Sequence, residues 1–154
     1  MLSLLLAHKE LRSVVFRDLF SSRKLRLNLR PHENKIEVLK EHDDITISYP
    51  YHLSSDTLHR LIFHLAAIMS NKESTLIFEE PESHGFPYYT NYLAETIARD
   101  EQGTQYFMST HNPYFLVPLV AKARKEDIAV FITYFEDYQT RVKRLTEAQL
   151  QQLA

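Results

Sequence analysis

The sequence predicts an α/β fold, in which a parallel sheet is flanked by helices and an antiparallel β-meander lies nearer the N-terminus. Three observations lead to this prediction. Leucines alternate with polar residues along 24–30, the period of a half-buried strand. Short, continuous apolar runs occur later, as in strands covered on both faces of a parallel sheet. Helical segments lie between these runs and complete βαβ units. The apolar runs are 75–79, 105–109 and 128–133, and the helical segments are about 88–100 and 113–124.

The N-terminal part is predicted to form a helix and then the meander. Residues 4–20 carry apolar side chains at a spacing close to 3.6, which predicts an amphipathic helix within 1–23. Alternation then continues around a turn at 42–44, so 24–49 is predicted to form three antiparallel strands.

The part that follows, 50–145, is predicted to hold the parallel-sheet core. The helical period returns at 58–69, after residues that favour a helix N-cap. A turn at 136–139 leads into a last strand at 140–145, and 146–154 is predicted to be a short polar helix. We expect the whole chain, 1–154, to form a single domain.

Composition excludes several classes of function. The net charge of −2 gives no global attraction to nucleic acid or to a membrane, and the absence of cysteine fits a reducing cytoplasm. The apolar opening at 2–7 is too short to span a bilayer. The chain has only two glycines, Gly85 and Gly103, so it contains neither a G-x-x-x-x-G-K-[ST] phosphate loop nor a G-x-G-x-x-G turn.

Two predicted strands end in polar residues that suit phosphate chemistry. Glu79 and Glu80 end the first apolar run, and Thr110 and His111 follow the second. Ligands of open α/β sheets lie outside the carboxyl ends of the strands, so we expect these residues to lie together. One carboxylate can hold Mg²⁺ through its waters, and the other can orient an attacking water. The histidine can donate a hydrogen bond to a γ-phosphate.

A possible anion site precedes the predicted helix at 58–69. Ser54 and Ser55 offer hydroxyls and free backbone N–H groups at a helix start. Taken alone, such residues more often form a helix cap, and an apolar strand that ends in two acids more often has no catalytic role. The order of helix start, acid-tipped strand and histidine-tipped strand favours the functional interpretation.

At these motifs, residues 53–113 resemble the C-terminal part of an ABC-type ATPase domain of the SMC, RecF and OLD group. Thr75-Leu76-Ile77-Phe78-Glu79-Glu80-Pro81-Glu82 resembles a Walker B motif, Ser83-His84-Gly85-Phe86-Pro87 a D-loop, and Ser109-Thr110-His111-Asn112-Pro113 a histidine switch. Leu53-Ser54-Ser55-Asp56-Thr57 lies where the signature motif belongs.

The resemblance implies a role for each of these residues. Glu79 would be the metal-side acid, Glu80 the catalytic base and His111 the sensor. Contacts to nucleotide would come from Ser54, Ser55, Thr110 and Asn112. The expected cofactors are ATP and Mg²⁺.

This chain departs from the family pattern in three ways. The Walker A loop is missing, the signature position has Asp56 and Thr57 in place of its glycine, and Glu79 replaces the commoner aspartate. We therefore expect a truncated ATPase, completed by a partner protein or a homodimer that supplies the phosphate loop. The alternative is a non-hydrolytic remnant that acts as a regulatory, protein-binding module.

Two small basic faces suggest DNA contact, or simply solvated charge. One face comprises Lys24, Arg26 and Arg30, and the other comprises Arg141, Lys143 and Arg144.

Overall fold

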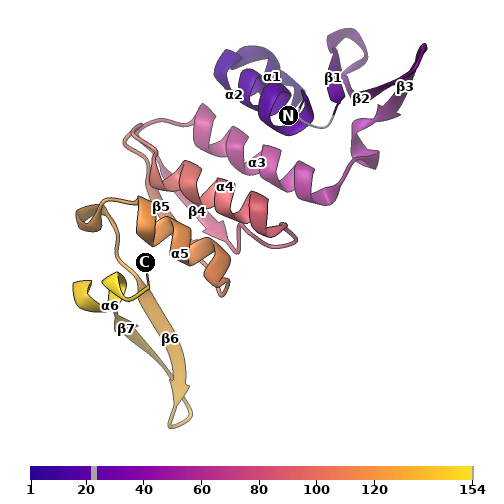
Figure 1. The fold of residues 1–154 in the computed structure, drawn as a ribbon. Helices are drawn as coiled ribbons and strands as arrows, with labels where there is room; N and C mark the ends of the chain where they lie inside the picture. Colours follow the sequence, from indigo (N-terminus) through magenta and orange to yellow (C-terminus); the bar gives the residue numbers. More distant parts are fainter. Residues whose placement is uncertain (22–23, 154) are drawn as a thin grey trace.

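A computed structural model describes residues 1–21 and 24–153. The N-terminal segment is helical but is not the one continuous helix that was predicted. It consists of α1 (Leu2–Ala7), α2 (Lys9–Val14) and a π-helical stretch, Val15–Phe20. The break falls at His8, whose extended backbone (φ −104°, ψ 100°) separates α1 from α2. These short helices lie beside α3 (Figure 1). They still bury their apolar side chains in the core, so the predicted apolar face is retained across the break.

The predicted meander is present as a three-stranded antiparallel sheet in the order β1–β2–β3. The strands are β1 (Leu25–Arg30), β2 (Lys35–His42) and β3 (Ile45–Pro50). Asn34 and Asp43 take left-handed conformations at the two turns, a conformation that Asn and Asp tolerate better than most residues. Leu27 and Val38 face each other in the register and are buried, whereas every residue of β3 is exposed.

Helix α3 (Asp56–Ser70) lies at the centre of the molecule and begins as predicted. Ser55 is its N-cap, and the Ser55 hydroxyl accepts a hydrogen bond from the Leu58 backbone N–H. Ile62 and Leu65 are fully buried and contribute to the core that joins the N-terminal helices, α3 and the second sheet.

The second sheet contains the predicted parallel pair, β4 (Thr75–Glu79) and β5 (Gln105–Ser109). Helices α4 (Pro87–Ala98) and α5 (Pro113–Lys122) follow these strands and, with α3, lie on one face of the pair. Leu76, Phe78 and Met108 point into that side. The prediction that both faces are covered is wrong in the described structure, because Ile77 on the other face is 77% exposed.

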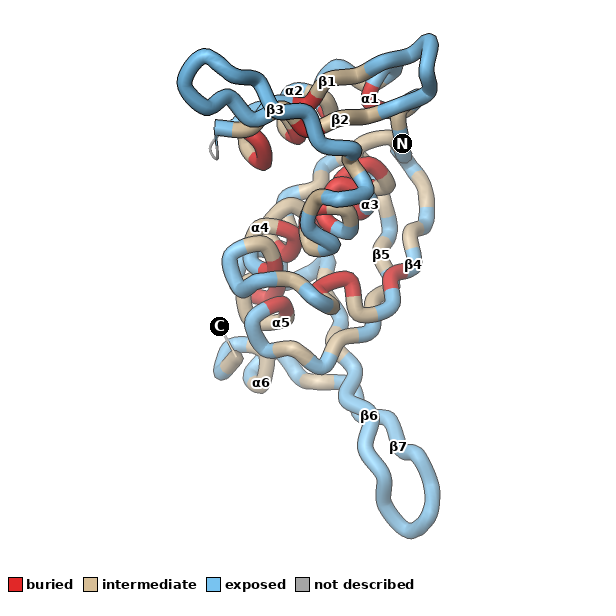
Figure 2. Tube along the Cα trace, turned by 90° about the vertical axis from the view of Figure 1, so that its right-hand side faces the viewer, coloured by how far each residue is buried: buried red, intermediate tan, exposed pale blue. Residues whose placement is uncertain are grey.

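The third apolar run does not join the parallel sheet, contrary to our prediction. Its strand, β6 (Phe131–Glu136), pairs antiparallel with β7 (Gln139–Arg144) in a separate two-stranded sheet. The hairpin projects away from the body, and every residue of both strands is exposed (Figures 1 and 2). Cross-strand hydrogen bonding across a tight turn favours this local pairing. The chain then forms α6 (Glu147–Gln151), inside the predicted terminal helix.

Across the described residues, none of the helices combines the length and the apolar character needed to cross a lipid bilayer.

Candidate functional site

Glu80 lies just after the last residue of β4, where the chain leaves the sheet. Its φ of +42° is in the left-handed region, which is uncommon for a residue with a side chain. The Glu80 backbone N–H donates to the Ser109 carbonyl at 3.0 Å, so the turn remains tied to the end of β5. The strand alternation therefore stops at Glu79, and Glu79 and Glu80 take up separate positions.

The Glu80 carboxylate contacts the histidine at the tip of the next strand. Glu80 Oε1 lies 2.7 Å from His111 Nδ1, and Glu80 Oε2 accepts a hydrogen bond of 3.1 Å from the Ser83 hydroxyl. An ionised carboxylate can only accept, so this contact is a hydrogen bond when His111 carries a proton on Nδ1. The side chains of Glu80 and His111 are 44% and 78% exposed, so both remain open to a ligand.

Glu79 is exposed on the uncovered face of the sheet, where it lies opposite Ser109 in the register. It lines an open groove of about 490 Å³ between α3 and β4. Asp56 and Arg60 line the α3 side of this groove, and Phe63 and Ile77 are apolar residues of its lining. Asp56 and Arg60 form an ion pair at 3.2 Å across one helical turn.

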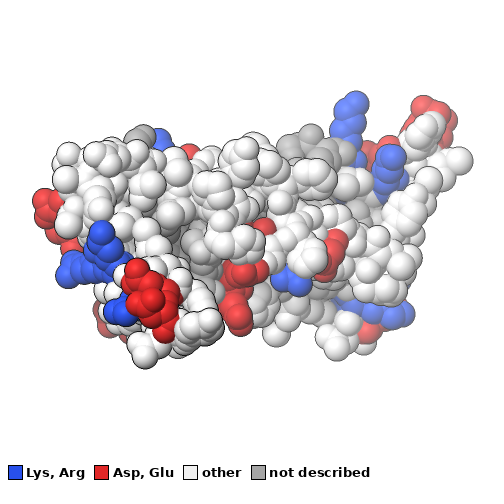
Figure 3. All heavy atoms as spheres, turned by 90° about the horizontal axis from the view of Figure 1, so that it is seen from below, with Lys and Arg blue, Asp and Glu red and all other residues white. Residues whose placement is uncertain are grey.

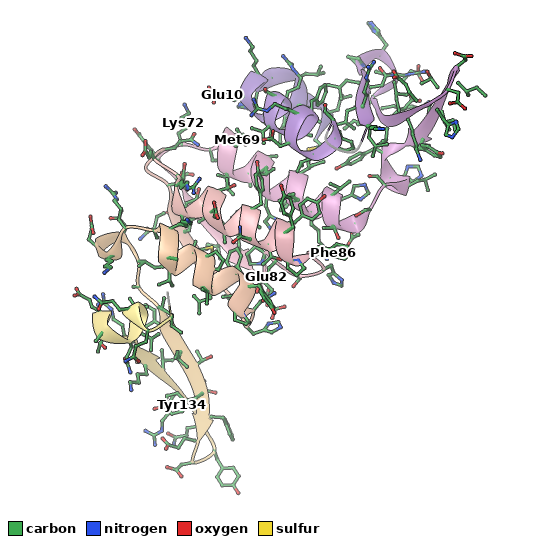
Figure 4. The ribbon with its side chains drawn as sticks, viewed as in Figure 1. Glu10, Met69, Lys72, Glu82, Phe86 and Tyr134 are labelled. Carbon is green, nitrogen blue, oxygen red and sulfur yellow. The ribbon has the colours of Figure 1, made fainter. Side chains whose placement is uncertain are left out.

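A third acid, Glu82, is buried between the loops that follow β4 and β5. Its side chain is on the loop before α4, close to the labelled N-cap residue Phe86 (Figure 4). The Thr110 hydroxyl donates to Glu82 Oε1 and accepts a hydrogen bond of 3.1 Å from the Asn112 backbone N–H. Within the described residues, Glu82 Oε2 is buried without a hydrogen-bond partner.

Two of the other predicted nucleotide contacts, Asn112 and Ser55, cap helices, and Ser54 makes a different contact. Asn112 is the N-cap of α5, and its Oδ1 accepts from the Tyr114 backbone N–H at 2.9 Å. The Ser55 hydroxyl caps α3. The Ser54 hydroxyl donates to the Tyr51 carbonyl at 2.7 Å and lies 2.8 Å from His59 Nε2.

Two links connect the start of α3 with the acid-bearing loop. The Thr57 hydroxyl donates to the His84 carbonyl at 2.8 Å, and Asp56 shares the open groove with Glu79. The structure thus brings Glu80 and His111 into direct contact and Thr110 into contact with Glu82. Among the hydrogen bonds of the described residues, none joins Ser54 or Ser55 to Glu79, Glu80 or His111.

The sequence did not single out two residues that contact the predicted site residues. Ser83 contacts Glu80, and Glu82 contacts Thr110. Ser83 was assigned only to a loop, although a hydroxyl three residues after an acid can reach back to it across a turn. Glu82 carried a signal that was not used. It follows Pro81 at a strand end, and a third carboxylate so close to two others needs its own hydrogen-bond donor when it is buried.

The two basic faces are partly neutralised by neighbouring acids. Arg30 pairs with Glu33 and Glu37, both at 3.0 Å, and Arg141 pairs with Glu136 at 3.0 Å. Figure 3 shows basic and acidic side chains next to one another on the face that it draws, without a broad surface of one sign. This mixture does not favour the DNA interpretation.

A family described as "AAA domain, putative AbiEii toxin, Type IV TA system" matches residues 4–117, which is most of the chain. The chain belongs to this AAA domain family. The match spans all of the predicted site residues.

A solved structure from work on "ATP-driven dimerization and DNA stimulated activation of SMC ATPases" has the same fold. The TM-score is 0.59 at 12% sequence identity, and the alignment covers 94% of this chain and 84% of that one. No curated protein gives a significant match. Family and fold together identify an ATPase-like, nucleotide-binding domain of the AAA and ABC type.

Proposed function

We propose that this chain is the Walker B and histidine-switch part of an ABC-type ATPase, and that a partner lobe carrying a phosphate loop completes it. The observation that carries the proposal is the 2.7 Å contact between Glu80 and His111. These side chains come from loops that follow two adjacent parallel strands, the edge at which α/β sheets bind their ligands.

The two acids would have different tasks. Glu80 is the proposed general base, because its carboxylate is exposed and is held by two side-chain donors, Ser83 and His111. Glu79 is the proposed acid on the Mg²⁺ side, because it is exposed on the face of β4 that the helices leave uncovered.

The residues present fit a magnesium ion bound together with a nucleotide. The described residues contain no group of three or more His, Cys, Asp or Glu arranged to hold a metal. Magnesium bound with a nucleotide needs only one or two protein carboxylates, because phosphate oxygens and waters complete its octahedron. Glu79 could be that carboxylate, and the bound ion would neutralise developing negative charge on the phosphate.

The proposed nucleotide contacts are Ser54, Ser55, Thr110 and Asn112. Two of these side chains, Ser55 and Asn112, already order a helix start, and Thr110 joins the two loops. The Ser54 hydroxyl is bonded to the Tyr51 carbonyl. We therefore infer that these side chains shape the loops around the nucleotide, while backbone N–H groups and the partner lobe make most of the phosphate contacts.

The uncovered face of the parallel pair supports the proposed partner. Ile77 and Phe107 lie on this face and are 77% and 54% exposed, and Phe63 across the groove is 59% exposed. In the described structure β4 and β5 pair only with each other, so each also has one open edge. Open edges and exposed apolar side chains beside a site are typical of a surface that another protein covers.

The experiment is a turnover measurement on the complex that the chain forms in its own cells. The complex is purified through an affinity tag on this chain, and phosphate release from ATP is measured with and without Mg²⁺. We expect magnesium-dependent release that Glu80→Gln reduces by roughly 10²–10⁴-fold, the usual effect of losing a general base.

A matched control is Glu101→Gln, a similar substitution at an exposed acid of the loop before β5. Turnover that Glu80→Gln leaves intact contradicts the assignment of the base. A purified complex that neither binds nor hydrolyses ATP contradicts the ATPase and favours the alternative, a regulatory module that binds its partner through the same uncovered face.

A further inference from the structure

We propose that Glu82 is a positioning residue which, through the Thr110 hydroxyl, fixes the loop that presents His111 to Glu80. The positional claim stands on the contacts below, and only its consequence for ATP turnover rests on the proposed function.

The first observation is the contrast in exposure among the three acids at the end of β4 and in the loop that follows it. Glu79 is exposed and the Glu80 side chain is 44% exposed, whereas Glu82 is only 5% exposed. A carboxylate is costly to bury unless donors replace its water. A surface loop could have placed any apolar residue at this position, so the buried acid requires an explanation in terms of its partner.

That partner is the residue directly before His111. The Thr110 hydroxyl donates its single proton to Glu82 Oε1 and accepts the Asn112 backbone N–H at 3.1 Å. The proton of the Thr110 hydroxyl is therefore donated to Glu82. The oxygen of the same hydroxyl accepts from the Asn112 backbone N–H, so it links the residues on the two sides of His111. The backbone on both sides of His111 is held by this one hydroxyl, whose orientation Glu82 determines.

The loop that carries Glu82 is itself tightly folded. The Ser83 backbone N–H donates to the Glu80 carbonyl at 2.9 Å, and the Gly85 backbone N–H donates to the Glu82 carbonyl at 2.9 Å. A Cβ added at Gly85 would lie 2.9 Å from that carbonyl oxygen and 3.0 Å from the Thr90 hydroxyl. Close packing thus leaves Glu82 little freedom to move away from Thr110.

The two loops are consequently joined at two adjacent points. Glu80 meets His111, and Glu82 meets Thr110. The first contact is exposed and weak, since even a fully charged pair at a surface contributes only about 0–1 kcal/mol. The second is partly buried and is made by the buried carboxylate of Glu82, so it restricts the loop more strongly. We infer that the contact between Glu82 and Thr110 sets the loop position and that the exposed contact follows from it.

The test is the tautomer of the His111 ring, which a purely structural role of Glu82 would not change. In the ¹⁵N-labelled full chain, NMR of the ring nitrogens shows whether the proton is on Nδ1 or on Nε2. The measurement is made in mildly alkaline buffer, where histidine side chains are ordinarily neutral. The His111 signals are assigned by their loss in His111→Gln.

We expect the Nδ1–H form in the wild-type chain, because Nδ1 donates to Glu80. Thr110→Val and Glu82→Leu should shift the ring toward the Nε2–H form that a free histidine side chain prefers. Glu80→Ala should do the same as a positive control. Thr110→Ser keeps the hydroxyl and Glu82→Gln keeps an acceptor oxygen, so both should retain the wild-type signals.

The matched control is Thr90→Val, which removes a buried hydroxyl from the same region without touching Thr110. It should leave the His111 signals unchanged. Folded Thr110→Val and Glu82→Leu chains that keep the Nδ1–H form overturn the proposal.

If those two variants do not fold, the wild-type chain gives the answer. The proposal requires a Thr110 hydroxyl proton that is protected from exchange and shows cross-peaks to Glu82, and its absence overturns the proposal. ATP turnover does not enter either readout. A chain with the expected tautomer but without turnover in its complex would lose the proposed function and keep the positioning role.

Discussion

Glu80 and His111 are 31 residues apart in the sequence, yet Glu80 Oε1 and His111 Nδ1 lie 2.7 Å apart. Both residues follow a strand of the same parallel pair, and the register places Glu79 opposite Ser109 immediately before them. The contact is therefore a product of topology, because parallel strands in register bring their trailing loops to one edge.

The first prediction concerns the stability contribution of this contact. Replacing His111 by Gln should change the free energy of unfolding by less than about 1 kcal/mol, because the His111 side chain is largely exposed and the Glu80 side chain is partly exposed. Thr110→Val should cost more, since it removes the donor from buried Glu82. Urea denaturation of the two variants beside the wild type measures both values, and a larger loss for His111→Gln would contradict this ranking.

The second prediction concerns the start of α3. Ser55→Ala removes the side-chain cap on the Leu58 N–H and should destabilise the fold by about 0.5–2 kcal/mol. Ser55→Asp supplies another capping oxygen and should remain close to the wild type. Thermal unfolding compares them, and equal losses in both variants would mean that the Ser55 hydroxyl has a different role.

The third prediction concerns pH and His64. Burial lowers the pKa of His64 below its ordinary value of 6.5, with a smaller lowering from the Arg60 charge. The hydrogen bond to the Arg60 carbonyl and the charge of Glu82 act in the opposite direction. As pH falls below 6.5 the unfolded chain takes up this proton before the folded one does, so the free energy of unfolding decreases there.

Above 6.5 this contribution to stability is fully present. Denaturation at about pH 7.5 and about pH 5.5 brackets the window, and His64→Phe should show a smaller pH dependence than the wild type. Phenylalanine keeps the aromatic packing against Phe78, where the ring centroids are 5.1 Å apart. An unchanged pH dependence in His64→Phe would show that other groups cause it.

The fourth prediction separates the two faces of β4. Ile77→Ser should alter the free energy of unfolding by no more than about 0.5 kcal/mol, because the side chain is already in water. It should nevertheless weaken capture of the native complex, if a partner covers this face. Phe78→Ala is the contrasting variant and should cost about 3–5 kcal/mol, because Phe78 lies in the core. Full capture of the complex by the folded Ile77→Ser chain would contradict the proposed docking face.

Local patterns predicted most of the fold, because the elements concerned bury one face within this chain. The alternation of 24–30 and the stripe of 58–69 correspond to β1 and α3, where a packed neighbour enforces the period. The failures lie where burial is missing. Continuous apolar character predicted two covered faces for β4, and Ile77 is exposed instead.

The run at 128–133 failed for a related reason. An apolar strand near a parallel pair can join that sheet or fold back on the next segment, and composition does not distinguish these outcomes. The turn at Asp137 and Tyr138, both with positive φ, favours the hairpin. The break at His8 likewise depends on backbone geometry that helical spacing does not encode.

In the candidate site, the pairing of Glu80 with His111 followed from strand topology, whereas the burial of Glu82 did not. Glu80 and Glu82 are two residues apart, and both follow the end of β4. Their different exposure arises from the turn that begins at Glu80, whose positive φ redirects the chain so that Glu82 lies beneath Thr110. Loop conformation of this kind is set by tertiary contacts rather than by residue spacing.

The projecting β6–β7 hairpin affects how this protein can diverge. Its residues are exposed on both strands, and its base is closed by the hydrogen bond from the Leu145 N–H to the Val130 carbonyl at 2.9 Å. Substitutions between those two residues should therefore have little effect on folding and should act mainly on whatever the hairpin contacts. Replacement of the whole hairpin by another should change what the protein binds and leave the remainder of the fold as it is.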